Sequence, residues 1–353
     1  MTTLAPRLLA WHGRHGRHDL PWQRPRSSYR VWIAEIMLQQ TQVKTASGYF
    51  ERFVARFPDL PTLAAADEDA VLALWSGLGY YRRARFLHRT AQLCMQRHDG
   101  ELPRSAQELA ALPGIGRSTA HAILAQAHGQ PLAILDGNVK RVLSRYHAVH
   151  GWAGTAAVER ELWALAERHT PSAQVADYTQ AIMDLGATVC TRARPRCALC
   201  PLAEDCLARR QGLIPALPQP RPRKLIPVRQ VCMLLLYDRQ GRVLLERRSG
   251  QGVWPRLWSL PESSDEGAAG EAARLALVGD TRPRPLAAFE HAFSHYRLCV
   301  RPLLWAAVSP HQGIADNDDL RWCAAEDWAG MGLPAPVRRL LLSIKPESET
   351  CPA

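Results

Sequence analysis

Apolar residues recur at a helical period through most of residues 1–210, and this pattern predicts a nearly all-helical region. Leu8, Leu9 and Trp11 form the apolar face of a first helix. A long helix is predicted over 29–45, where apolar positions surround the single acidic residue Glu35. Gln39, four residues later, is expected on the same helix face.

A helix, a tight turn and a second helix are predicted over 105–127, with Leu112-Pro-Gly-Ile-Gly116 as the turn. Ser105 and Glu108 have the spacing of a capping box at the start of the first helix. Another helix is predicted over 139–149, entered through Asp136-Gly-Asn138.

The pattern changes after residue 210. Prolines alternate with Arg and Lys over 211–229, which predicts a stiff, extended linker that spaces two domains, follows DNA phosphates, or does both. Beyond it, strands are predicted over 231–237, 243–245 and 293–304, and helices over 271–278 and 335–344. The chain is therefore expected to be multidomain, with an all-α domain over 1–210, a linker over 211–229 and an α+β domain over 230–348.

The length of 353 residues suits two domains, and the net charge of +11 suits a polyanionic partner such as DNA or an acidic membrane. Many Arg-rich proteins are basic without binding nucleic acid, so charge alone leaves this open. No apolar run is long enough for a membrane span, and no signal-peptide core is present. The Arg-rich N-terminus has the composition of a transit peptide, but its apolar face favours a domain helix.

Four of the nine cysteines, Cys190, Cys197, Cys200 and Cys206, have the spacing C-x6-C-x2-C-x5-C. Thiolates this close in sequence can surround one metal centre, either zinc or a [4Fe–4S] cluster. A structural zinc site more often has two C-x2-C pairs, and only one is present here. The arginines within 190–206 suggest that the metal shapes a loop that contacts phosphate.

Three other features have a functional and a purely structural interpretation. Gly114 and Gly116 in the turn allow a backbone to approach a DNA phosphate at a helix N-terminus, or they simply connect two helices. Glu35 on an apolar helix favours a raised pKa and proton donation, although an ordinary exposed position has the same pattern. Asp136 is a preferred N-cap residue, or the ionised partner that glycosidic cleavage needs beside a protonated carboxyl.

The motifs together resemble the helix-hairpin-helix glycosylase superfamily and, more narrowly, the MutY-type adenine DNA glycosylases over almost the whole chain. They are Leu20-Pro-Trp22, Glu35-Ile-Met-Leu-Gln-Gln-Thr-Gln42, Gly77-Leu-Gly-Tyr-Tyr81, Leu112-Pro-Gly-Ile-Gly-Arg-Ser-Thr119, Leu135-Asp-Gly-Asn-Val-Lys-Arg141, the four-cysteine loop and Phe293-Ser-His-Tyr296. The resemblance implies a [4Fe–4S] cluster rather than zinc, and a base-excision-repair enzyme of the bacterial cytoplasm and nucleoid.

The resemblance also implies roles for individual residues. Glu35 protonates adenine N7 and later activates water, Asp136 stabilises the sugar cation, and Asn138 positions the site. Trp22, Ser118 and Gln180 belong to the adenine pocket. DNA contacts fall on Gln39, Gln40, Thr41, Leu78, Tyr80, Gly114, Gly116 and Lys140, with Gln40 and Tyr80 wedged into the duplex.

Related enzymes of the endonuclease III type cut the strand through a Schiff-base lysine at the position that Ser118 holds here. A serine cannot form that Schiff base, so a monofunctional glycosylase is expected. Lys140 could still trap product covalently, but a phosphate contact is the simpler interpretation.

The C-terminal domain resembles the Nudix fold without its acidic metal-binding cluster, since 262–280 holds only scattered Glu and Asp. It is expected to bind 8-oxoguanine through Ser294 and His295 without hydrolysis. The predicted partner is therefore double-stranded DNA with adenine opposite 8-oxoguanine or guanine, bound by a monomer. The alternatives are a bifunctional pyrimidine glycosylase/lyase, a non-catalytic iron–sulfur DNA-binding protein, and a nucleotide-pool hydrolase, which the missing acidic cluster disfavours.

Overall fold

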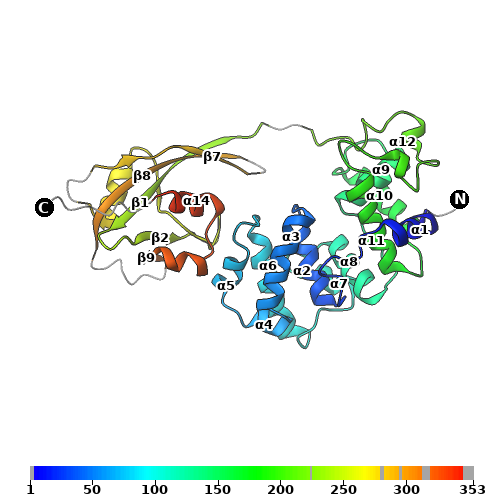
Figure 1. The fold of residues 1–353 in the computed structure, drawn as a ribbon, viewed down its shortest axis with the longest axis horizontal. Helices are drawn as coiled ribbons and strands as arrows, with labels where there is room; N and C mark the ends of the chain where they lie inside the picture. The colour runs from blue at the N-terminus through cyan, green and yellow to red at the C-terminus, as the bar shows by residue number, and fades with distance from the viewer. Residues whose placement is uncertain (1–3, 223–224, 279–281, 294–295, 312–318, 345–353) are drawn as a thin grey trace. The chain divides into compact units, whose positions relative to one another are not determined.

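The computed structural model describes the chain except for residues 1–3, 223–224, 279–281, 294–295, 312–318 and 345–353 (Figure 1). It divides into two compact units. The first comprises Met1–Ala65 and Phe86–Arg223, and the second comprises Ala66–Arg85 and Lys224–Ala353. Among the described residues, no helix combines the length and apolar character needed to cross a membrane.

The first unit is helical. Its helices are α1 (Ala5–His15), α2 (Ser28–Leu38), α3 (Val43–Arg56), α4 (Leu60–Ala64), α6 (Arg82–Arg97, which begins in the second unit), α7 (Ala106–Ala110), α8 (Arg117–His128), α9 (Gly137–Tyr146), α10 (Ala156–His169), α11 (Val175–Asp184) and α12 (Leu207–Arg210). A π-helical turn, Leu185–Val189, continues α11, and a short 3-10 turn lies at Cys197–Leu199.

Local capping explains several helix starts. The side chains of Ser27, Asp59, Ser105 and Asp136 each accept a hydrogen bond from a backbone N–H in the first turn of α2, α4, α7 and α9. α2 packs on α8, and α8 also packs on α11. A buried cluster that includes Leu8, Val142, Leu162 and Ile182 joins α1, α9, α10 and α11, which lie together in Figure 1. These contacts bring α2, α8, α9 and α11 around one region.

The second unit contains a mixed sheet. Its strands are β1 (Val228–Asp238), β2 (Val243–Arg247), β3 (Trp258–Ser259), β4 (Glu262–Ser263), β5 (Ala276–Leu277), β6 (Arg284–Pro285), β7 (Phe289–Ala292), β8 (Arg297–Pro310) and β9 (Leu320–Cys323). Its helices are α5 (Glu68–Leu74), α13 (Ala268–Leu275), a 3-10 helix at Ala325–Gly330, and α14 (Ala335–Ser343). β1 and β8 run parallel at the centre, and β7 pairs antiparallel with β8.

The helical first unit and the mixed-sheet second unit confirm the predicted fold class. The predicted hairpin of 231–237 and 243–245 is confirmed as β1 and β2. α5 packs against the 3-10 helix, so residues 66–85 belong structurally with the sheet rather than with the helices that flank them in sequence.

Several element boundaries were predicted wrongly. The helix predicted over 139–149 is α9, which begins at Gly137 and ends at Tyr146. The helix predicted over 29–45 ends at Leu38, because Gln40 takes a left-handed backbone with φ 59° and α3 starts separately at Val43. The strand predicted over 293–304 begins at Arg297, and Phe293 instead follows the end of β7 at Ala292. The helix predicted over 271–278 ends at Leu275, where the chain becomes extended and pairs with β8.

The first half of the predicted linker is not a free spacer. Leu217 is buried, and its carbonyl accepts a 2.8 Å hydrogen bond from Nε of Arg145 on α9. Gln219 forms a β-bridge with Trp152. Residues 211–219 therefore pack on the first unit before the chain leaves it.

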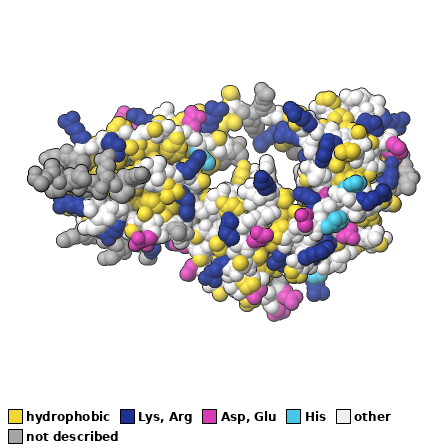
Figure 2. Space-filling model, in the orientation of Figure 1, with side chains coloured by type: hydrophobic (Ala, Val, Ile, Leu, Met, Phe, Trp, Pro, Cys, Tyr) yellow, Lys and Arg dark blue, Asp and Glu magenta, His cyan; other side chains and the backbone are white. Residues whose placement is uncertain are grey.

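The surface of each unit carries many basic side chains. Figure 2 shows Lys and Arg side chains spread over the visible face of both units, with acidic side chains scattered among them. This distribution agrees with the net charge of +11, which is therefore not confined to one unit.

Candidate active site

A cavity of about 460 Å³ in the first unit collects all the predicted catalytic and adenine-pocket residues and three of the predicted DNA-binding residues. It is bordered by the end of α2, the start of α8, the start of α9 and the middle of α11. The predicted residues that line it are Trp22, Glu35, Gln39, Gln40, Thr41, Ser118, Asp136, Asn138 and Gln180. Residues far apart in the sequence thus share one polar cavity.

Glu35 has the environment of a proton donor. Burial raises the pKa of Glu35 to about 7, and the negative charge of Asp136 contributes to this rise. A 3.0 Å hydrogen bond from Nε2 of Gln126 on α8 acts in the opposite direction, because it favours the ionised carboxylate. A carboxyl with this pKa exchanges its proton near neutral pH, as general acid–base chemistry requires.

Asp136 is both a helix cap and a member of the cavity. Its Oδ1 accepts a 2.8 Å hydrogen bond from the backbone N–H of Val139, and its Oδ2 accepts a 3.1 Å bond from Nδ2 of Asn138. Burial raises the pKa of Asp136, while these hydrogen bonds lower it and favour the charged form. The two interpretations of Asp136 are therefore compatible, since capping orients a carboxylate that still borders the cavity.

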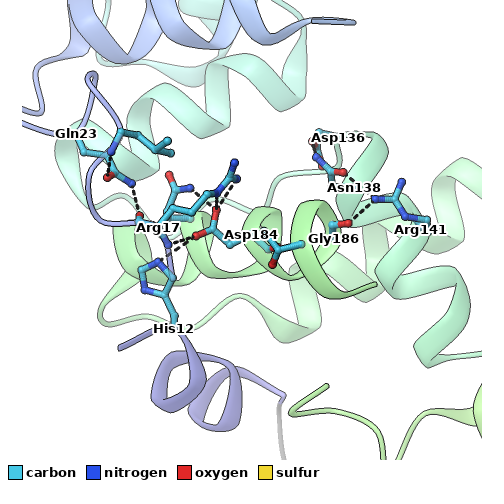
Figure 3. Close-up of polar contacts among 11 residues, drawn as sticks. His12, Arg17, Gln23, Asp136, Asn138, Arg141, Asp184 and Gly186 are labelled. Atoms are coloured by element: carbon cyan, nitrogen blue, oxygen red, sulfur yellow. Dashed lines mark hydrogen bonds and ion pairs between the residues drawn. The ribbon is translucent and has the colours of Figure 1, made fainter. Parts of the chain in front are cut away.

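Asn138 is held by a cation that the sequence analysis did not identify. Arg141 donates from Nη2 to Oδ1 of Asn138 at 2.8 Å and to the carbonyl of Gly186 at 2.7 Å (Figure 3). Its Nε donates to the carbonyl of Cys190 at 2.7 Å. One guanidinium therefore connects the start of α9, the π-helical turn and the cysteine loop.

Gly186 allows this approach. A Cβ atom on Gly186 would lie 2.6 Å from Cβ of Asn138, which is closer than real Cβ contacts. The glycine is needed for close packing of two backbones rather than for an unusual turn.

A second polar cluster holds the opposite side of the cavity. The buried carboxylate of Asp184 accepts hydrogen bonds from the backbone N–H, Nε and Nη2 of Arg17 at 2.7, 2.9 and 2.6 Å (Figure 3). It also accepts one from Nε2 of Gln180 at 2.7 Å. Because Nε2 of Gln180 donates to Asp184, the orientation of the amide is set, and its oxygen can accept a hydrogen bond from a base.

The other pocket residues have clear structural partners. Trp22 is buried and packs edge-on against Phe50 with ring centroids 5.6 Å apart, so it is both wall and core. Oγ of Ser118 accepts a 2.9 Å hydrogen bond from the backbone N–H of Leu135, next to Asp136. Gln39 ends α2 instead of continuing it, but it still lines the cavity beside Glu35.

The predicted turn between α7 and α8 has the expected geometry. Gly114 has φ 77°, and a Cβ there would lie 2.9 Å from Cβ of Phe86. Gly116 is the N-cap of α8, so backbone N–H groups of the first helical turn point away from the helix at this place. Lys140 forms a 2.6 Å ion pair with Glu159, which gives it a structural partner outside the cavity.

Leu78 and Tyr80 belong to the second unit, so the structure does not place them relative to the cavity. Tyr80 is 49% exposed and has φ 49°, a left-handed backbone that is uncommon for a tyrosine. Gln40 also has a left-handed φ. Both residues predicted to enter the duplex thus sit at backbone positions of unusual geometry.

The four predicted cysteine ligands line one small cavity, together with Val189, Pro195, Ala203, Arg209 and Ile214. Nη1 of Arg145 lies 3.4 Å from Sγ of Cys190, so a cation faces the sulfurs. Among the residues that the structure describes, no group of three or more His, Cys, Asp or Glu side chains has metal-binding geometry. The cysteines share a cavity, and their type and number fit a metal centre held by four thiolates.

Ser294 and His295 lie outside the described residues. Phe293 and Tyr296 flank them in the chain, and the backbone N–H of Phe293 donates a 2.9 Å hydrogen bond to the carbonyl of Tyr296. The rings of Phe293 and Tyr296 stack with centroids 4.6 Å apart, and the guanidinium of Arg229 lies 5.0 Å from the centroid of the Tyr296 ring.

The residues missed by sequence reasoning are Arg17, Gln126, Arg141 and Asp184. Gln126 and Asp184 each interrupt an apolar helical segment, which is the same signal that identified Glu35. Arg17 lies in a basic segment without a distinguishing pattern, and Arg141 ends a recognised motif that assigned it no role, so only the fold reveals their partners.

Comparisons with known proteins agree with this geometry. Residues 33–168 match the family model of the HhH-GPD superfamily base excision DNA repair proteins, and residues 232–343 match the NUDIX domain. The chain is 34% identical to the adenine DNA glycosylase of Buchnera aphidicola subsp. Acyrthosiphon pisum (strain APS), over 96% of each chain. It is 42% identical to the adenine DNA glycosylase of Homo sapiens, over 60% of this chain and 40% of the human one.

A solved thermostable thymine-DNA glycosylase has the same fold over 59% of this chain and 95% of its own, with a TM-score of 0.54 and 24% identity. The near-complete match to a curated relative decides the family. Together with the helical unit, the mixed sheet and the carboxylate-lined cavity, it shows that this chain is a glycosylase that belongs to the adenine DNA glycosylase family.

Proposed function

We propose that the protein hydrolyses the N-glycosidic bond of adenine paired with 8-oxoguanine or guanine in duplex DNA. The observation that carries this proposal is Glu35, a carboxyl with a pKa of about 7, in the same cavity as Asp136. Two carboxyl groups with different environments supply the proton donor and the anion that glycosidic cleavage needs. Because the substrate is chromosomal DNA, the site of action is the nucleoid of a bacterial cytoplasm.

The proposed reaction begins when adenine leaves the base stack and enters the cavity. The Glu35 carboxyl donates its proton to N7, the bond between C1′ and N9 breaks, and the electron pair of that bond stays with the base. The Asp136 carboxylate stabilises the positive charge on the sugar. Glu35, now ionised, accepts a proton from the water that attacks C1′.

The structure supports a pocket for an amino-purine. Gln180 presents its amide oxygen, because Asp184 accepts from its nitrogen, and an oxygen there accepts from the 6-amino group of adenine. Trp22 forms a wall of the same cavity. Ser118 occupies the position of a lyase lysine and is bonded to the backbone, so we propose base removal without strand cutting.

The test is single-turnover release of adenine from a duplex that contains the mispair. Glu35→Gln should abolish release, because glutamine cannot donate the proton. Glu51→Gln, at an exposed position of α3, is the matched control and should react normally. Full activity of Glu35→Gln, or no release by the native protein, would falsify the proposal.

We propose that the second unit reads the base opposite adenine through Ser294 and His295, between β7 and β8. The hydrogen bond and ring stacking between Phe293 and Tyr296, which flank them in the chain, support this proposal. The double variant Ser294→Ala/His295→Ala should lose the rate difference between adenine opposite 8-oxoguanine and adenine opposite guanine. An unchanged ratio of these two rates would rule out recognition of the opposite base by Ser294 and His295.

We propose that Cys190, Cys197, Cys200 and Cys206 hold a [4Fe–4S] cluster. When bound, the cluster would tie the loop over 190–206 into a compact structure, and the loop's arginines would then contact DNA phosphates. Iron and sulfide content, with the visible absorbance of the purified protein, tests the metal, and Cys200→Ser should lose both. Stoichiometric zinc in place of iron would contradict the cluster.

A further inference from the structure

Residues 76–81, which include the exposed Tyr80, are bonded at both ends to the carbonyl of Leu333 within the second unit. Oγ of Ser76 and the hydroxyl of Tyr81 each donate a 3.0 Å hydrogen bond to the carbonyl of Leu333. The Tyr81 hydroxyl also accepts a 3.2 Å bond from the backbone N–H of Gly77. Leu333 and Tyr81 are buried, so these bonds are shielded from competing water.

A second attachment lies at the start of α5. Asp69 forms an ion pair with Arg247 of β2 and accepts a 3.4 Å hydrogen bond from Nε1 of Trp258 on β3. The Arg247 guanidinium also lies 5.2 Å from the centroid of the Trp258 ring. The pair is partly buried, with side-chain exposures of 19% for Arg247 and 33% for Asp69.

Close packing accompanies the polar contacts. A Cβ on Gly332 would lie 2.8 Å from Cβ of Leu72 on α5 and 3.1 Å from Cδ2 of Leu257. The backbone before Leu333 therefore reaches α5 only because a glycine stands there. α5 therefore contacts the sheet and the segment before Leu333 at Asp69, at Leu72 and just beyond its C-terminal end.

The loop itself is rigid between these attachments. Nε1 of Trp75 and Nη2 of Arg83 each donate a 3.1 Å hydrogen bond to the carbonyl of Gly79. The Arg83 guanidinium lies 5.3 Å from the centroid of the Trp75 ring and 5.6 Å from that of Tyr80. The carbonyl before Tyr80 is thus held twice, while the Tyr80 ring stays exposed.

We propose that the C-terminal domain positions the duplex wedge, with Arg247 and the Leu333 carbonyl as positioning groups that act through Tyr80. The inference rests on the proposed entry of Tyr80 into DNA. It adds that the domain expected to read the lesion also sets the orientation of the residue that opens the base stack beside it. A rigid aromatic enters a stack more readily than a mobile one, because less conformational entropy is lost.

The test compares single-turnover adenine release by the full chain in two backgrounds, native and Tyr80→Ala. Tyr80→Ala should slow release by about tenfold, the scale of one lost base–aromatic contact. Arg247→Gln should slow release by about threefold in the native background and have no further effect in the Tyr80→Ala background. Arg247→Lys should recover most of the rate, because it keeps the charge.

The matched control is Arg242→Gln, which removes a 2.7 Å ion pair with Asp238 in the same domain, at the turn between β1 and β2. It should leave the rate unchanged. A DNA probe gives a second readout, since 2-aminopurine placed beside the mispair brightens when the stack opens. Arg247→Gln should reduce that brightening, and Arg242→Gln should not.

If Arg247→Gln lowers the folded fraction, Ser76→Ala replaces it, because that change removes one bond to Leu333 and keeps the bond from Tyr81. Equal slowing by either variant in both backgrounds would overturn the inference, since the effect would not pass through Tyr80. A normal rate for Tyr80→Ala would also overturn it and would remove the wedge role, while adenine release would still support the proposed glycosylase.

Discussion

Replacing Glu35 with glutamine should make the protein more stable at neutral pH while it removes activity. Burial raises the pKa of Glu35 from 4.5 to about 7, so the folded state carries a cost for the ionised carboxylate. A pKa difference of this size corresponds to about 3.5 kcal/mol, at about 1.4 kcal/mol for each pH unit. Glutamine has a similar shape, cannot ionise, and can still accept from Gln126.

The sign follows from the order of the two pKa values. Below about pH 4, Glu35 is protonated in both states and costs nothing. As pH rises from 4.5 to about 7, the unfolded chain ionises first, so the native protein loses stability relative to the variant. Above about pH 7 the full difference is present.

The assay is chemical denaturation of Glu35→Gln and the native protein across this pH range. The helical circular-dichroism signal is suitable because it comes mainly from the first unit. Glu51→Gln, the exposed control on α3, should show a difference that does not change with pH. A Glu35→Gln difference that is constant with pH, or that shrinks as pH rises, would refute the buried-carboxyl argument.

Three further predictions concern the same site. The single-turnover rate should fall as pH rises through about 7, where Glu35 loses its proton. In a pH–rate profile, Gln126→Leu should move the midpoint of this fall upward by about one pH unit, because the variant loses the hydrogen bond that favours the carboxylate. A downward shift of the midpoint would contradict the assigned role of that hydrogen bond. Gly186→Ala should destabilise the protein by about 1–3 kcal/mol and slow adenine release at least about tenfold, because its methyl group meets the start of α9. Denaturation and rate measurements check this, with Gly13→Ala, which has open space, as the neutral control. Asp184→Asn should cost about 3 kcal/mol in denaturation, because it breaks a buried ion pair, and equal stability would show that the pair is not needed.

Local sequence patterns predicted the elements and the types of site residue. Helical periodicity and capping residues depend on neighbours a few positions apart, so α1, α7 and α8 could be recognised from the chain alone. Prediction from sequence failed where the same local pattern fits more than one backbone conformation. The apolar run that begins at Val31 ends at Leu38, and the polar segment Gln39-Gln-Thr-Gln42 that follows has no Gly or Pro to signal the left-handed turn at Gln40.

The linker and the segment of residues 66–85 show the same limit. Proline content predicted an extended segment, but Leu217 is buried because Arg145, 72 residues earlier, offers a hydrogen bond to its carbonyl. Nothing within 66–85 indicates that Ser76 and Tyr81 bond to Leu333, more than 250 residues later. Contacts of this kind depend on the path of the whole chain.

The sequence by itself determined the two kinds of unit, the four-cysteine spacing and the identity of both carboxylates, because these are local properties or shared motifs. Only the tertiary structure decided what those carboxylates can do. Glu35 has a pKa near neutrality because α8 and α9 fold over it, and its bond to Gln126 joins residues 91 positions apart. A pKa is set by solvent exclusion and nearby charge, and both are properties of packing in space.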